Sequence, residues 1–123
     1  MLKALKESDV KELIFMADAR SAIRVTEEIS FDKPLTQEQA REFSNINTAS
    51  LQITKKIESL NKDEIVELMA LMWLGRGDDE GESFSFHRDF ALSSVNDGSA
   101  EYISSKGDLG DYLRDGMKLL SKE

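Results

Sequence analysis

The residues with the clearest chemical character lie between Trp73 and Asp78, in the sequence Trp-Leu-Gly-Arg-Gly-Asp. An aromatic ring, a guanidinium and a carboxylate are separated here by two glycines. A guanidinium can bind a carboxylate or phosphate through two parallel hydrogen bonds, and glycines let a ligand come close to the backbone. The segment therefore suggests a binding site for a small anion, formed by Trp73, Gly75, Arg76, Gly77 and Asp78.

The same residues also have a structural interpretation, which we favour. Gly75 can end the preceding helix in the left-handed conformation, and Gly77 can form the turn that follows. Arg76 then lies near the helix C-terminus, where the helix dipole favours a cation. This interpretation predicts a positive φ angle at Gly75.

Two other residues have side chains that can act in catalysis. His87 is the only histidine, and no nucleophile motif such as Gly-x-Ser-x-Gly occurs beside it. Glu67 is the only polar residue in the apolar run 65–74, so it should be buried and must then have a partner. Neither pattern is sufficient for an enzyme, and we predict no catalytic residue. The possible partners of Glu67 are Arg20, Arg24 and Arg41.

The composition argues against several classes of partner. With one histidine and no cysteine, a zinc or iron site is improbable, and the acidic residues 78–82 do not match a calcium-binding loop. We predict no metal and no cofactor.

The net charge of −8 argues against nucleic-acid binding, which requires basic residues. No segment predicts a membrane span, and the first eight residues lack the apolar run of a signal peptide, so we expect a cytoplasmic protein.

The apolar run belongs to a helix that should form the centre of the fold. Asn61 and Glu64 have the spacing of a capping box, in which each side chain accepts a hydrogen bond from the other residue's backbone. A helix that is apolar around its whole circumference is surrounded by protein. The pattern predicts a buried helix from Asn61 to about Gly75.

The rest of the chain predicts helices and no strands. A first helix is expected from about Ser8 to Ser30, and a second begins at the capping box of Thr36 and Gln39. Further helices are expected within 83–95, 99–105 and 108–120. The predicted fold is all-α: a single domain, 1–123, forming a compact bundle of about five helices. Its N-terminal hairpin (1–60) packs on the buried central helix of the second half (61–123).

The second helix carries a seam of heptad spacing, which allows two interpretations. It can pack on the first helix within one chain, which we favour, or it can form the interface of a homodimer. The seam is shorter than the three or four heptads of a typical coiled coil. Its members are Phe43, Ile46, Ser50, Ile53, Ile57 and Leu60.

Two segments of the second half resemble a known family. The run from Leu60 to Asp78, with the pattern Glu-Leu-x-Ala-Leu-x-Trp-Leu-Gly-Arg-Gly-Asp, resembles the signature of small bacterial proteins that carry a domain of unknown function. The segment from Asp111 to Gly116 resembles the second recurrent block of that family. The resemblance implies a bacterial, cytoplasmic, helical domain, and it implies no activity. It leaves the first two helices outside the family.

These observations favour a non-enzymatic module that binds another protein or a second copy of itself. The alternative is a small protein that binds an anionic ligand through residues 73–78.

Overall fold

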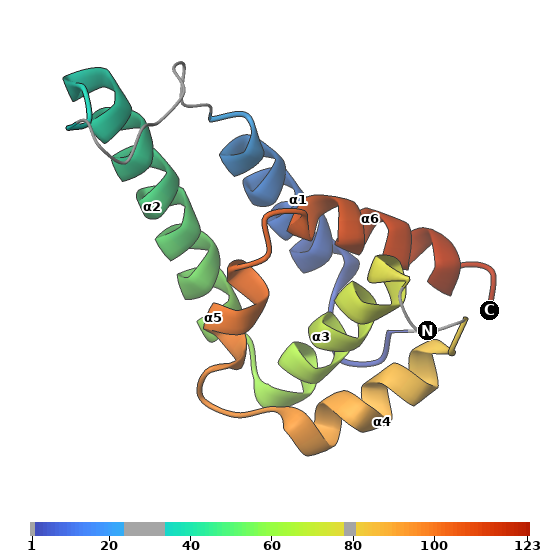
Figure 1. The fold of residues 1–123 in the computed structure, drawn as a ribbon. Coiled ribbons are helices and arrows are strands. Elements are labelled where there is room, and N and C mark those ends of the chain that lie inside the picture. Colours follow the sequence, from blue (N-terminus) through green and yellow to red (C-terminus); the bar gives the residue numbers. More distant parts are fainter. Residues whose placement is uncertain (1, 24–33, 78–80) are drawn as a thin grey trace.

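The computed structural model describes residues 2–23, 34–77 and 81–123, and these residues form six α-helices and no strand (Figure 1). The predicted all-α class is confirmed, with six helices rather than about five. The helices are α1 (Glu7–Ser21), α2 (Gln37–Glu58), α3 (Lys62–Arg76), α4 (Phe84–Ser94), α5 (Ser99–Ser104) and α6 (Leu109–Leu120).

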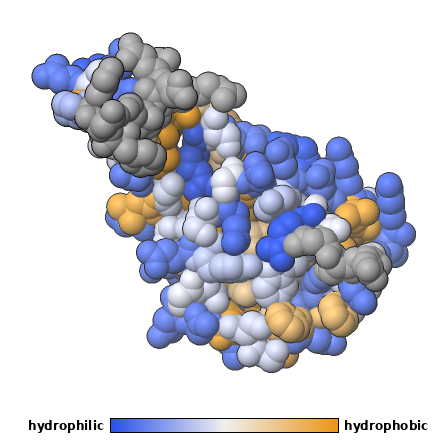
Figure 2. All heavy atoms as spheres, viewed as in Figure 1, coloured by the Kyte–Doolittle hydropathy of each residue, from blue (hydrophilic) through white to orange (hydrophobic). Residues whose placement is uncertain are grey.

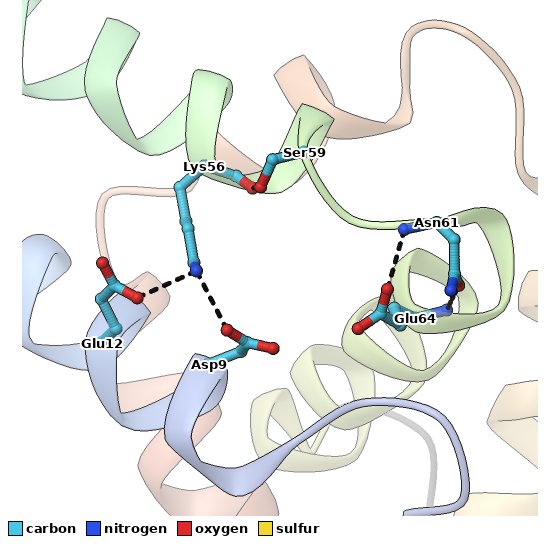
Figure 3. A network of polar contacts seen from close by, with 6 residues as sticks. All are labelled: Asp9, Glu12, Lys56, Ser59, Asn61 and Glu64. Atoms are coloured by element: carbon cyan, nitrogen blue, oxygen red, sulfur yellow. Dashed lines mark hydrogen bonds and ion pairs between the residues drawn. The ribbon is translucent and has the colours of Figure 1, made fainter.

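The predicted central helix is α3, and its predicted capping box is present. The backbone N–H of Glu64 donates to Asn61 Oδ1, and the backbone N–H of Asn61 donates to Glu64 Oε1, each at 2.9 Å (Figure 3). Every residue from Val66 to Met72 is buried, and so is Leu74. The most extensive contacts of α3 are with α6 and α4, and α5 adds a smaller one.

The N-terminal helices are arranged differently from the prediction. In the described part of the chain, α1 packs mainly on α6 and α2 mainly on α5, rather than on α3 (Figure 1). α1 and α2 also contact each other, and Lys56 of α2 forms ion pairs with Asp9 (3.0 Å) and Glu12 (2.9 Å) of α1 (Figure 3). The helices of the hairpin therefore have their most extensive contacts outside the hairpin with α5 and α6 rather than with the central helix.

The predicted ends of the first two helices can be compared with the structure. The capping box at the start of α2 is present, with Gln39 N–H donating to Thr36 Oγ1 at 3.0 Å. α1 ends at Ser21 rather than near Ser30, and residues 24–33, on which the rest of that prediction falls, lie outside the described residues. None of the helices in the described ranges is long and apolar enough to cross a membrane.

The contact between α3 and α6 depends on two glycines. A Cβ at Gly75 would overlap the carbonyl oxygen of Tyr112, and a Cβ at Gly116 would overlap the carbonyl oxygen of Leu71. Gly75 therefore lies inside α3, where hydrogen in place of a side chain lets the α6 backbone approach. The predicted positive φ at Gly75 is wrong, because the left-handed residue that ends the helix is Gly77, with φ of 75°. Gly116 of α6 correspondingly lies against the backbone of α3 at Leu71.

Candidate functional site

Trp73 joins three helices near the C-terminal end of α3. Its side chain is half-buried, and its indole Nε1 donates a hydrogen bond to the hydroxyl of Tyr102 in α5 at 3.0 Å. The ring centroid lies 5.6 Å from that of Phe90 in an edge-on arrangement, and 6.5 Å from that of His87, both in α4. Trp73 therefore contacts α4 and α5, whereas Leu71 is the α3 residue that lies against Gly116 of α6.

Two cations accompany Trp73 at the phenol of Tyr102. The exposed side chain of Arg76 lies near the phenol of Tyr102 and favours its ionised form, and Lys106 Nζ lies 4.4 Å from the centroid of the tyrosine ring. Burial alone would raise the pKa of Tyr102. The hydrogen bond from Trp73, together with the nearby positive charges of Arg76 and Lys106, outweighs burial, and the pKa of Tyr102 is lowered from its ordinary value. We call Tyr102, Arg76 and Lys106 the tyrosine cluster.

The position of α5, and with it Tyr102, is fixed by a buried arginine. Arg20 of α1 donates to the carbonyl oxygens of Ser104 (2.5 Å) and Lys106 (2.7 Å), at the C-terminal end of α5. Arg20 also donates to Ser50 Oγ of α2 at 3.2 Å. Burial lowers the pKa of Arg20, and the helix dipole favours a cation at this end of α5. Arg20 thus connects the N-terminal helices to the tyrosine cluster.

The neighbouring helix α4 presents an aromatic side to solvent. Phe86 and Phe90 are one helical turn apart, with exposed fractions of 49% and 59%. Phe84, His87 and Ala91 of the same helix are buried, so α4 has distinct inner and outer sides. Hydrophobic side chains are visible over α4 in Figure 2. The residues that we call the aromatic surface are Trp73, Phe86, Phe90 and Tyr102.

The structure brings together only part of the predicted anion site. Trp73 and Arg76 meet at Tyr102, whereas Gly75 packs against α6 and Gly77 ends α3. Asp78, the fifth predicted residue, lies outside the described residues.

The sequence analysis missed Tyr102 and Lys106. Tyr102 lies in α5, and Lys106 follows the end of that helix, four residues further along the chain. Nothing local linked that helix to Trp73, which is 29 residues from Tyr102 in the sequence.

Glu67 is buried as predicted, with an exposed fraction of 3%, but its partner is not an arginine. Its carboxylate accepts hydrogen bonds from the backbone N–H groups of Lys3 (2.8 Å), Ala4 (2.7 Å) and Leu5 (2.7 Å). We call residues 2–5 the N-terminal strap. The sequence does not indicate such partners, because the backbone of almost any residue type can supply an N–H donor. Among the possible partners, Arg20 is directed to α5 instead.

The fold and the site define the chain as a small all-helical domain with an aromatic surface that is bordered by two cations. In the described residues, no three histidine, aspartate or glutamate side chains are placed to hold a metal ion together.

The model of a family of proteins of unknown function, DUF3775, matches residues 50–121. This is more than half of the chain, so the chain belongs to that family. The match begins within α2, earlier than the resemblance suggested, and includes the aromatic surface, the tyrosine cluster and Glu67. Arg20 and the N-terminal strap precede the match. No curated protein and no solved structure matches the chain.

Proposed function

We propose that this chain is a non-enzymatic, cytoplasmic protein-interaction module, and that the aromatic surface is its docking site. The supporting observation is the exposure of Phe86 and Phe90 on one side of α4, beside the half-buried Trp73. Phenylalanine is usually buried, since removing its side chain from water contributes about 1.5–3 kcal/mol. Tryptophan, tyrosine and arginine dominate the residues that contribute most to binding at protein interfaces, and Tyr102 and Arg76 accompany Trp73 here.

The alternative, a small anionic ligand bound by residues 73–78, has weaker support. Arg76 and Trp73 meet at Tyr102, but Gly75 and Gly77 serve the packing and the end of α3. A small anion bound by residues 73–78 would also not explain why Phe86 and Phe90 of α4 are exposed. A protein partner accounts for both the cations and the aromatic rings.

A homodimer through α2 is a second proposal, and it concerns a different surface. Ile53 and Ile57 are fully buried within the monomer, so only the first half of the seam is available to a partner. Phe43 and Ile46 are half-buried there, on the part of α2 that projects from the rest of the fold (Figure 1). A second copy of the chain would cover these residues by pairing the two α2 helices.

The docking proposal is tested by replacing Phe90 with a photo-crosslinking phenylalanine derivative in cells that naturally make the protein. The matched control places the same derivative at Phe15, which is 74% exposed on α1. We expect one dominant crosslinked protein from position 90 that is absent from position 15. The crosslinked protein is then purified, and its affinity for the unmodified chain is measured by calorimetry.

Variants of the exposed phenylalanines connect the affinity to the surface. Phe86→Ser and Phe90→Ser should each weaken binding at least tenfold, because both side chains lose their apolar contact area. Phe15→Ser should leave the affinity unchanged. Equal crosslinking from positions 15 and 90, or binding that is insensitive to both α4 variants, would refute this docking site.

A further inference from the structure

A pocket lies where the N-terminal strap, α3 and α4 meet (Figure 1). Its volume is about 410 Å³, which falls within the range of roughly 300–1,000 Å³ that is typical of small-molecule sites. We call it the strap pocket, and its lining includes Lys3 and Ala4 of the strap, Asp63 and Val66 of α3, and Arg88 and Leu92 of α4.

The strap pocket is separate from the aromatic surface. Leu92 lines the pocket, and Phe90 belongs to the aromatic surface. The two residues are two positions apart in α4, which is just over half a helical turn. The pocket and the aromatic surface therefore lie on different sides of this helix.

The strap pocket has charged side chains of both signs that are available to a ligand. Lys3 and Arg88 are cations, and the carboxylates of Asp63 and Asp89 also line the pocket. Among the residues that the structure describes, none of these four side chains forms a hydrogen bond or an ion pair. Two cations and two carboxylates thus face one pocket without neutralising each other through direct contact.

Apolar groups complete the lining. Leu92 is 52% exposed, and the buried Val66 and the half-buried Ala4 are near it at the same pocket. A ligand with an apolar body would remove the side chain of Leu92 from water, and burial of apolar surface favours binding.

We infer that the strap pocket binds a small zwitterion of the amino-acid type with an aliphatic side chain. The carboxylate of the ligand pairs with Arg88 and Lys3, since a guanidinium can bind a carboxylate through two parallel hydrogen bonds. The ammonium of the ligand pairs with Asp89 and Asp63, and its aliphatic body covers Leu92. This inference does not depend on the docking site proposed above.

The charge of the protein favours a zwitterion over an ion of one sign. The net charge of −8 repels an anion at long range, whereas a zwitterion carries no net charge. A simple cation would pair with the carboxylates but would leave Lys3 and Arg88 without a partner. Only a ligand with both charges satisfies both pairs of side chains.

The strap connects this pocket to the buried carboxylate of Glu67. The backbone N–H groups of Lys3 (2.8 Å) and Ala4 (2.7 Å) donate to Glu67, so the side chains of these two residues line the pocket only while the strap is docked. A ligand that binds only this docked form must stabilise it. We therefore expect slower hydrogen exchange at the amides of Lys3 and Ala4 when the ligand is bound.

The test compares leucine with two molecules that each lack one of its charges. Isocaproate has the aliphatic body and the carboxylate of leucine, and isoamylamine has the aliphatic body and the ammonium. Each is titrated into the intact, isotope-labelled protein, and binding is followed by the NMR shifts of the backbone amides. We expect saturable shifts at Ala4, Val66 and Leu92, and leucine should bind at least tenfold more tightly than either analogue.

Variants of the charged side chains assign each contact. Arg88→Gln should weaken leucine binding at least fivefold and reduce the preference for leucine over isoamylamine, because the carboxylate loses its main partner. Asp89→Asn should reduce the preference for leucine over isocaproate. The matched controls are Lys11→Gln and Asp115→Asn, which alter exposed charges outside the pocket and should leave the affinity unchanged.

Several outcomes would overturn the inference. Leucine that binds no more tightly than isocaproate would show that the carboxylates of the pocket take no part, and equal binding of isoamylamine would show the same for the cations. Shifts that saturate only outside the pocket, or affinity that is insensitive to both Arg88→Gln and Asp89→Asn, would also contradict it. The crosslinking experiment at Phe90 tests the docking site independently of these results.

Discussion

At the scale of single residues, Glu67 shows how one buried carboxylate can hold a segment that is not helical. Three successive backbone N–H groups of the N-terminal strap converge on it. An ionised carboxylate is an acceptor only, so it can accept several such donors. Each hydrogen bond to a charged group contributes about 1.5–3 kcal/mol when it forms in a protein. Glu67 is therefore the attachment point of residues 2–5 on α3.

Replacing Glu67 with glutamine should loosen the strap. The amide Nε2 is a donor, so it would face the N–H of Lys3 or Ala4, and the free energy of unfolding should fall by about 1–3 kcal/mol. Amide hydrogen exchange at Lys3, Ala4 and Leu5 should become faster. Glu64→Gln is the matched control, because glutamine also completes a capping box. Unchanged exchange at these amides in Glu67→Gln would contradict this account of the strap.

The titration of Tyr102 gives a second prediction at this scale. Trp73→Phe removes a hydrogen bond that favours the phenolate, so the pKa of Tyr102 should rise relative to the unaltered protein. Because the pKa of Tyr102 is lower in the folded protein than its ordinary value, ionisation of Tyr102 favours folding. This contribution is absent at neutral pH and is fully present only above the unfolded pKa of about 10.

Phenolate absorbance measures this pKa, and a Tyr112→Phe background leaves Tyr102 as the only tyrosine. The reference is the same background with Trp73 intact. A pKa that does not move when Trp73 is replaced would show that the indole does not stabilise the phenolate.

At the scale of elements, the crossing of α3 and α6 should be intolerant of any side chain at its two glycines. Gly75→Ala places a methyl group against the carbonyl of Tyr112, which belongs to the backbone and cannot rotate away. We expect a loss of about 3 kcal/mol or more, at the upper end of typical overpacking costs. Denaturation by urea measures the loss.

Gly107→Ala is the control for this crossing, because a Cβ at Gly107 meets no atom within 4 Å. It should change the free energy of unfolding by less than about 1 kcal/mol. Equal stabilities of Gly75→Ala and Gly107→Ala would mean that the two helices are farther apart than described here.

The same elements show what the sequence could and could not predict. Both capping boxes were predicted because their partners are three residues apart, and the buried helix was predicted from its uniform apolarity. Gly75 was predicted to end the helix, whereas Gly77 ends it and Gly75 packs against α6. The approach of α6 could not be predicted from the sequence of α3 alone. Tyr102 was missed for the same reason, since its contact with Trp73 depends on how α5 is held by Arg20.

At the scale of the whole molecule, the proposed homodimer requires the projecting half of α2. If two copies pair there, Ile46→Asp should shift the mass measured by sedimentation equilibrium at micromolar concentration from dimer to monomer, because a buried unpaired charge is costly. Leu51→Asp, on an exposed position of the same helix, should leave the dimer intact. A monomeric mass for the unaltered protein would exclude this assembly.

The attachment of the N-terminal strap to Glu67 has a consequence for biosynthesis. Lys3 and Glu67 are 64 residues apart, and ribosomes add about 5–20 residues per second, so the strap waits roughly 3–13 s before its acceptor is made. During this interval Leu2 and Leu5 cannot reach their final positions at the core. The growing chain therefore presents an apolar segment that chaperones can bind, and release of that segment has to precede the docking of residues 2–5 onto α3.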